Sequence, residues 1–173
     1  MTQELTDLRN SILEGRYQDA LEIVDELEGM SKQAILRNIQ SFIDRMLIHL
    51  IKNQVEQRLT NSWVASISDS LVQIKRLNLK ENKTSYYVKN DEWESLVEEG
   101  IANAIRPASV EVLNGRLKPA QLSERLDRTQ LILTAKQLLA LTYEHSATAL
   151  PDIIDEYLIQ LPGGQEWFEN SQE

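Results

Sequence analysis

The sequence predicts an all-α fold, a compact bundle of about six to eight helices. Apolar residues recur at helical spacing along most of the chain, and no convincing segment alternates apolar and polar residues as a half-buried strand does. Hydrophobic residues make up 42% and charged residues 26% of the 173 residues, which is enough for a core and too apolar for a disordered chain. We expect one domain over residues 1–162 and an acidic, flexible C-terminal tail over residues 163–173.

The first half of the chain is expected to form four helices. Gly15 and Gly29 are placed to end the first two, because glycine readily adopts the conformation that follows a helix C-terminus. Ser31 is a suitable N-cap for the third helix. That helix has a wide apolar face and no proline, so we expect it to be the central core helix. The four helices are expected over residues 2–14, 17–28, 31–58 and 62–78.

Prolines and acidic caps mark the helices of the second half. Asp91 begins a sequence that resembles a capping box and predicts a helix start. Pro107 is expected to kink or end that helix. Pro119 opens a short helix, Asp127 caps the next one, and Pro151 opens the last.

Composition and missing motifs restrict the function classes. The net charge of −9 argues against nucleic-acid binding, and the lack of cysteine excludes disulfides and cysteine nucleophiles. No phosphate-binding loop, dinucleotide-binding motif, nucleophile elbow or zinc-binding HExxH motif is present. We therefore assign no catalytic, cofactor-binding or metal-binding residue, and we expect no cofactor. The chain has no apolar run long enough to span a bilayer, and its N-terminus does not resemble a signal peptide. Both observations favour a cytoplasmic protein.

One polar cluster stands out on the expected core helix and its surroundings. Arg45, His49 and Lys52 form a stripe beside the apolar face. His49, at the edge of the core, is either a titrating or ligand-contacting group, or a structural histidine hydrogen-bonded to an acid such as Glu26 on a neighbouring helix. The structural role is the commoner one. Trp63 begins the next helix, where a tryptophan is more often a core anchor than a recognition residue.

Three short motifs occur in order along the chain, Gly29-Met30-Ser31, His49-Leu50-Ile51-Lys52 and Ser62-Trp63. They resemble the marks of the domain of unknown function 29 family, abundant in cyanobacteria. The family's marks are an acidic helix that ends near a Gly-Met-Ser-like turn, a His-Leu-Leu-Lys-like motif and a downstream Ser-Trp. They are matched here by Gly29-Met30-Ser31, His49-Leu50-Ile51-Lys52 and Ser62-Trp63. The similarity is specific over residues 15–78, and the stretches 105–109 and 161–164 look like a cyanobacterial subgroup.

The resemblance implies a cytoplasmic α-helical bundle and supplies no activity. It also directs attention to Glu26, His49, Lys52 and Trp63 as one cluster. The function that we expect is that of a non-enzymatic interaction module, which binds a protein partner or a second copy of itself as a homodimer. Tyr86-Tyr87 and Trp167-Phe168 are candidate surface aromatics for such binding.

Two alternatives stay open at this stage. The first is a small-ligand-binding or catalytic protein with a polar pocket near His49 that uses Glu26, Arg45 and Lys52. The second is a nucleic-acid-associated regulator, which the acidic net charge opposes. Its contacts would come from the basic residues of the core helix and its flanks, Lys32, Arg37, Arg45, Lys52 and Arg58.

Overall fold

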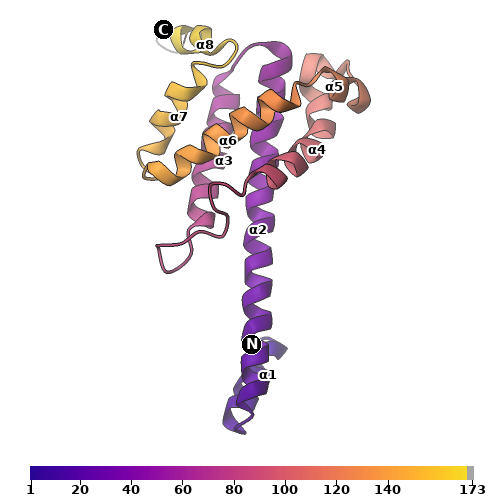
Figure 1. Ribbon diagram of the computed structural model, residues 1–173. Helices are drawn as coiled ribbons and strands as arrows, with labels where there is room; N and C mark the ends of the chain where they lie inside the picture. Colours follow the sequence, from indigo (N-terminus) through magenta and orange to yellow (C-terminus); the bar gives the residue numbers. More distant parts are fainter. Residues whose placement is uncertain (171–173) are drawn as a thin grey trace. The chain divides into compact units, whose positions relative to one another are not determined.

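The computed structural model describes residues 1–170, which form eight α-helices and one short 3-10 helix (Figure 1). No strand occurs in this range, although Leu79 and Tyr86 form an isolated bridge. The predicted all-α fold class is therefore confirmed. The helices are α1 (Gln3–Leu13), α2 (Tyr17–Glu56), α3 (Asn61–Asn78), α4 (Glu94–Glu111), η1 (Val112–Gly115), α5 (Pro119–Arg125), α6 (Arg128–Glu144), α7 (Leu150–Leu158) and α8 (Gly164–Asn170).

The chain divides into two compact units, Met1–Asn38 and a second unit that begins at Ile39. The long helix α2 contributes its first part to one unit and its second part to the other. The expectation of a single domain over residues 1–162 stays a prediction.

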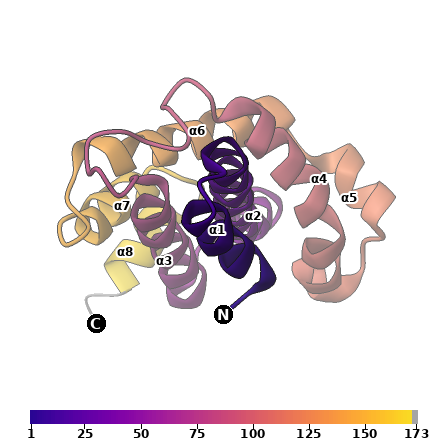
Figure 2. The same cartoon turned by 90° about the horizontal axis from the view of Figure 1, so that it is seen from below.

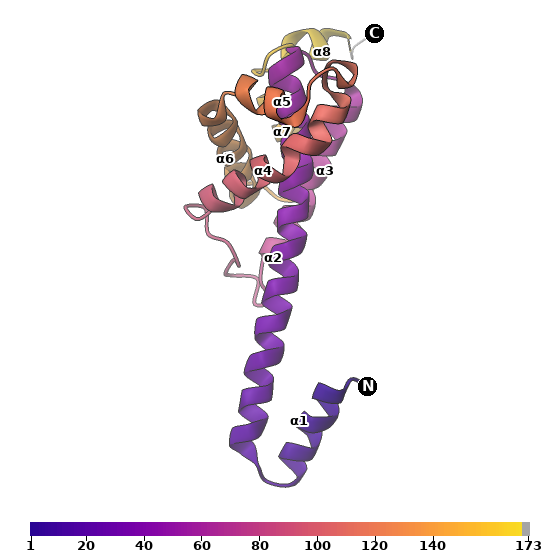
Figure 3. The same cartoon turned by 90° about the vertical axis from the view of Figure 1, so that its right-hand side faces the viewer.

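The first unit is a helical hairpin. Thr2 caps α1 by accepting a hydrogen bond from the backbone N–H of Leu5, and Gly15 makes the turn with a positive φ of 75°. The chain then reverses, so that α1 folds back beside the first turns of α2 (Figure 3). Ser11 and Ala20 are buried, whereas most of the other side chains of the hairpin are exposed.

The predicted break at residues 29–31 is wrong, because α2 runs without interruption from Tyr17 to Glu56. Gly29 does not end a helix, and Ser31 is a helix-interior residue rather than an N-cap. A single glycine inside a helix costs only about 1 kcal/mol, which good helix formers on both sides offset. The expected helices 17–28 and 31–58 are therefore one element.

The core of the second unit surrounds the second part of α2. Polar contacts join this part of α2 to α3, through Arg45 and Asp69, and to α4, through Gln40 and the carbonyl of Leu96. The end-on view shows α3 and α4 on opposite sides of α2 (Figure 2). Helix α3 also packs against α6 and α7, and α6 packs against α4 and α7. The fully buried apolar side chains of α2 are Ile39, Ile43, Met46, Leu47 and Ile51.

Helix α4 differs from the expectation at its start and at its proline. It begins at Glu94 without a side-chain cap, so Asp91 does not cap it. Pro107 lies inside the helix, which continues to Glu111. Proline removes one backbone hydrogen bond, and the burial of Ala104 and Ala108 on either side of it holds the helix together.

The remaining helix starts follow the sequence signals. Pro119 stands at the start of α5, Asp127 caps α6 by accepting from the N–H of Gln130 at 3.1 Å, and Pro151 lies in the first turn of α7. Residues 164–170 of the expected flexible tail form helix α8, whose Trp167 donates its indole N–H to Asn61 at 2.8 Å. The rest of that tail, 171–173, lies outside the described residues.

Candidate functional site

The connection between α2 and α3 positions the most polar part of the second unit. Helix α2 ends at Glu56 because Gln57 has a positive φ of 56°, which is outside the helical region. The chain then extends to Thr60, whose hydroxyl accepts a hydrogen bond from the N–H of Trp63 at 3.1 Å and caps α3. This cap places the Trp63 ring against the last turns of α2.

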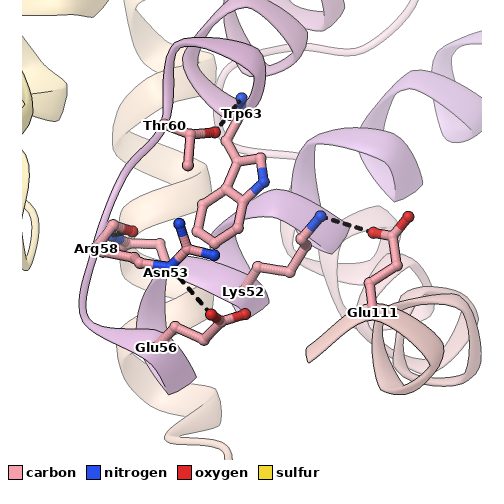
Figure 4. A network of polar contacts seen from close by, with 7 residues as sticks. All are labelled: Lys52, Asn53, Glu56, Arg58, Thr60, Trp63 and Glu111. Atoms are coloured by element: carbon pink, nitrogen blue, oxygen red, sulfur yellow. Dashed lines mark hydrogen bonds and ion pairs between the residues drawn. The ribbon is translucent and has the colours of Figure 1, made fainter. Parts of the chain in front are cut away.

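Trp63 lies between two cations (Figure 4). Lys52 Nζ is 4.8 Å from the centroid of the indole ring and Arg58 Cζ is 4.7 Å from it, both within the range of cation–π attraction. Each cation also has a carboxylate partner. Lys52 Nζ donates to Glu111 at 2.7 Å, and Arg58 Nε donates to Glu56 at 3.0 Å.

Lys52 is a buried charge, since only 7% of the residue is accessible to solvent. Burial of an unpaired ammonium group would be costly, and the Glu111 carboxylate and the Trp63 ring together supply compensation. Glu111 is the last residue of α4, so this contact ties the end of α4 to α2 and α3. The network stabilises the packing of three helices.

His49 lies one turn before Lys52 and is half-buried. Its Nδ1 atom is buried and has no hydrogen-bond partner among the described residues. Burial, followed by repulsion from Lys52, lowers the pKa of His49 to about 4; Glu111 opposes the shift and Arg45 adds to it. The lowered pKa favours the neutral imidazole near pH 7.

The five residues of the predicted cluster are not brought together as one site. Lys52 and Trp63 are in contact, and the charges of Lys52 and Arg45 lower the pKa of His49. Arg45 itself is exposed and turned to α3, where it donates to Ser66 at 2.8 Å and to Asp69 at 3.0 Å.

Glu26 stands apart from the other four residues. It is exposed, belongs to the first unit, and lies on the same helix as His49 rather than on a neighbouring one. The suggested hydrogen bond from His49 to Glu26 is not formed, because the two residues belong to one continuous helix. That the cluster has a functional role stays a prediction.

Asn53, Arg58 and Glu111 complete the network, and sequence reasoning did not assign them to the site. The Asn53 amide donates to the carbonyl of Arg58 at 3.0 Å and to that of Pro162 at 2.8 Å. Arg58 had been considered only as a phosphate-binding charge. No sequence pattern indicated that Glu111 belongs to the network, because it follows a proline that was expected to disrupt its helix.

A small, mainly apolar hollow lies on the second unit near the C-terminal loop, and His49 is not among its lining residues. Its lining includes Asn53 and Gln54, and both side chains are engaged in internal hydrogen bonds, the latter in two with the backbone of Asp127. The geometry gives the alternative of a catalytic pocket at His49 no support. The described residues also contain no group of three His, Asp or Glu side chains that could hold a metal ion.

The fold and the polar network define an all-helical protein with a partly buried charge cluster in its second unit. The comparison of sequences supplies the family. The chain belongs to the family described as Domain of unknown function DUF29, whose model matches residues 2–143. No curated protein and no solved structure matches the chain. The family likeness read from the sequence is thereby confirmed, and the cyanobacterial type stays a prediction.

Proposed function

We propose that this protein is a non-enzymatic interaction module that binds its partner through the hairpin of the first unit, Met1–Asn38. The observation that carries the proposal is the concentration of exposed apolar side chains there. Large hydrophobic residues are normally scattered singly over a protein surface, and a continuous group marks a binding site. The hairpin exposes Leu5, Ile12, Leu13, Tyr17, Leu21, Val24 and Met30.

The spacing on α2 turns three of these residues into a row. Tyr17, Leu21 and Val24 follow one another at intervals of four and three residues, which places them on one side of a helix. Their exposed fractions are 66%, 58% and 42%. An amphipathic helix normally buries such a row against another element, so this one is suited to receive an element from a binding partner.

Two further features support a binding role over the alternatives. Among the basic residues considered for nucleic-acid contact, Arg45 pairs with Asp69, Lys52 with Glu111, and Arg58 with Glu56. No helix within residues 1–170 has the length and apolar character to span a membrane. A cytoplasmic location belongs to the same proposal, and its support is the family likeness and the lack of cysteine.

Site-specific photo-crosslinking in cells of the native host tests this proposal. A photoreactive amino acid replaces Leu21 in the full-length chain, and a matched control carries it at Leu133 of α6. Both positions are exposed leucines on helices, 58% and 48% respectively, in different units. We expect a discrete adduct from position 21 and none from position 133. Equal labelling, or none at position 21, would contradict the proposal.

A further inference from the structure

We infer that the partner of the hairpin is an amphipathic helix with basic flanks. This inference rests on the proposed function, because it identifies the class of partner for the same surface. Its evidence is different, however. The proposed function depends on exposed apolar area, whereas the partner class depends on the charges that surround this area.

The apolar row on α2 lies in a strictly acidic segment. Between Tyr17 and Met30 there are five acidic residues and no lysine or arginine. All five carboxylate residues are exposed. They are Asp19, Glu22, Asp25, Glu26 and Glu28.

Two of these acids lie beside the apolar row and not on the opposite face of the helix. At 100° per residue, Glu28 falls close to Leu21 and Val24 around the helix axis, and Asp25 falls just beside them. A partner that covers the row must therefore approach these carboxylates. Lysine or arginine at the edge of the partner's apolar face would pair with them, whereas acidic residues there would be repelled.

The hollow between α1 and α2 adds negative charge to the same hairpin. Asp7, Glu14, Asp19, Glu22 and Glu26 contribute to its lining, and Arg16 is the one cation that lines it. Arg16 is already engaged by Glu14 and Asp19, at 2.9 and 3.0 Å. At 100° per residue, the α2 acids of this hollow lie on the side of the helix away from the apolar row. They therefore add to the overall negative charge of the hairpin, whereas Asp25 and Glu28 supply the charge beside the row.

Charge also argues against the other occupants. A second copy that docked hairpin to hairpin would place the acidic segment of one molecule against that of the other. Phosphate-bearing surfaces would be repelled in the same way. The shape of the row suits a helix, because a partner helix with apolar residues at the same spacing can pack its apolar face along the row.

Binding of designed peptides to the purified full-length chain tests this inference. Two peptides share one leucine face of helical spacing and differ only in their flanking residues, lysine in one and glutamate in the other. Fluorescence anisotropy of the labelled peptides measures the affinity. We expect the lysine peptide to bind at least about tenfold more tightly than the glutamate peptide, which corresponds to about 1.4 kcal/mol.

Variants separate specific docking from general attraction to an acidic protein. Leu21→Ser should weaken binding of the lysine peptide about fivefold or more, and the matched Leu133→Ser should leave it unchanged. The double variant Asp25→Lys with Glu28→Lys should reduce or reverse the preference between the peptides. Binding that is insensitive to Leu21→Ser would show charge attraction alone and would overturn the inference.

The remaining outcomes distinguish the two proposals. Equal binding of both peptides, or a crosslinked dimer of the chain from position 21, overturns the basic partner but leaves the hairpin as an interaction surface. Absence of any specific adduct from position 21 in the crosslinking experiment removes the proposed function itself.

Discussion

The two parts of helix α2 both have apolar residues at helical spacing, and they differ in what surrounds these residues. In the second part, Ile43, Met46 and Leu47 are completely buried among the helices of the second unit. In the first part, Tyr17, Leu21 and Val24 keep between 42% and 66% of their surface exposed. Both parts have apolar residues at helical spacing and charged residues between them. Helical periodicity thus specifies a face to be covered, but it does not specify what covers the face.

The largest expected effect tests this contrast directly. Leu47→Ala should lower the free energy of unfolding by about 2 to 5 kcal/mol, because it removes a fully buried side chain and leaves a cavity. Leu21→Ala should cost less than about 0.5 kcal/mol, because most of that side chain is already in water. Urea denaturation of both variants provides the measurement. A comparable loss from Leu21→Ala would mean that its surface is covered in solution.

A glycine comparison between the units comes next in size. Gly163 has a φ of 72°, and a Cβ atom there would lie 2.6 Å from the Cα of Arg58. Gly163→Ala should therefore destabilise the protein by about 2 to 4 kcal/mol, through backbone strain and a backbone clash. Gly15 has a similar φ of 75° but no atom within 4 Å of such a Cβ.

The control Gly15→Ala carries only the conformational penalty, on the order of 1 kcal/mol. Thermal denaturation of the two variants measures the difference. Equal losses would indicate that the close approach of residues 57, 58 and 163 is not maintained in solution.

A smaller effect concerns His49 and pH. Its pKa in the folded protein is about 4 against an ordinary value of 6.5, so the unfolded chain binds more protons between these values. The stability contribution is fully present above pH 6.5 and is lost as the pH falls toward 4. It amounts to on the order of 2 kcal/mol once solvent screening of the half-buried ring is allowed for.

The measurement for His49 is the difference between two pH–stability profiles, wild type and His49→Gln. Carboxylates contribute to both profiles and cancel in the difference. We expect the wild type to lose more stability than the variant between pH 6.5 and 4. Parallel profiles would contradict a buried, neutral histidine.

The smallest effect is the coupling between Arg58 and Trp63. A double-mutant cycle with Arg58→Ala and Trp63→Leu should give a coupling energy of about 0.5 to 1 kcal/mol. This is the value expected for a solvent-exposed cation over a tryptophan ring. Arg16→Ala in the first unit serves as the comparison, since the Arg16 guanidinium contacts the carboxylates of Glu14 and Asp19 on the surface. This substitution should leave the stability almost unchanged, because water screens an exposed ion pair. A coupling energy near zero would show that the cation–π contact between Arg58 and Trp63 contributes nothing to stability.

Much of the fold follows from local sequence signals. Thr60, Pro119 and Asp127 act at helix starts because capping and proline preferences concern a residue and its immediate neighbours. The errors arose where one helix-disfavouring residue was given more weight than its neighbours. Gly29 is exposed and is carried by helix formers on both sides, whereas Pro107 is flanked by the buried Ala104 and Ala108. Gly29 and Pro107 each disfavour a helix, yet each lies inside one.

The site was less predictable than the fold, for a related reason. Lys52 and Trp63 were identified from their positions on amphipathic helices. Their partner Glu111 comes from a helix far along the chain, and a single sequence does not show which helices meet. Glu26 was placed on a neighbouring helix because a break was expected at Gly29; once α2 is continuous, that juxtaposition is lost.

The hydrogen bond between Asn53 and the C-terminal loop shows that the folded core extends beyond the segment that the family model matches. The family match stops at residue 143, whereas Asn53 reaches Pro162, and Leu150, Ile154 and Leu158 of α7 are fully buried. A chain shortened to the matched segment would keep every residue that the family model matches, and it would still expose to water the faces of α3 and α6 against which α7 packs.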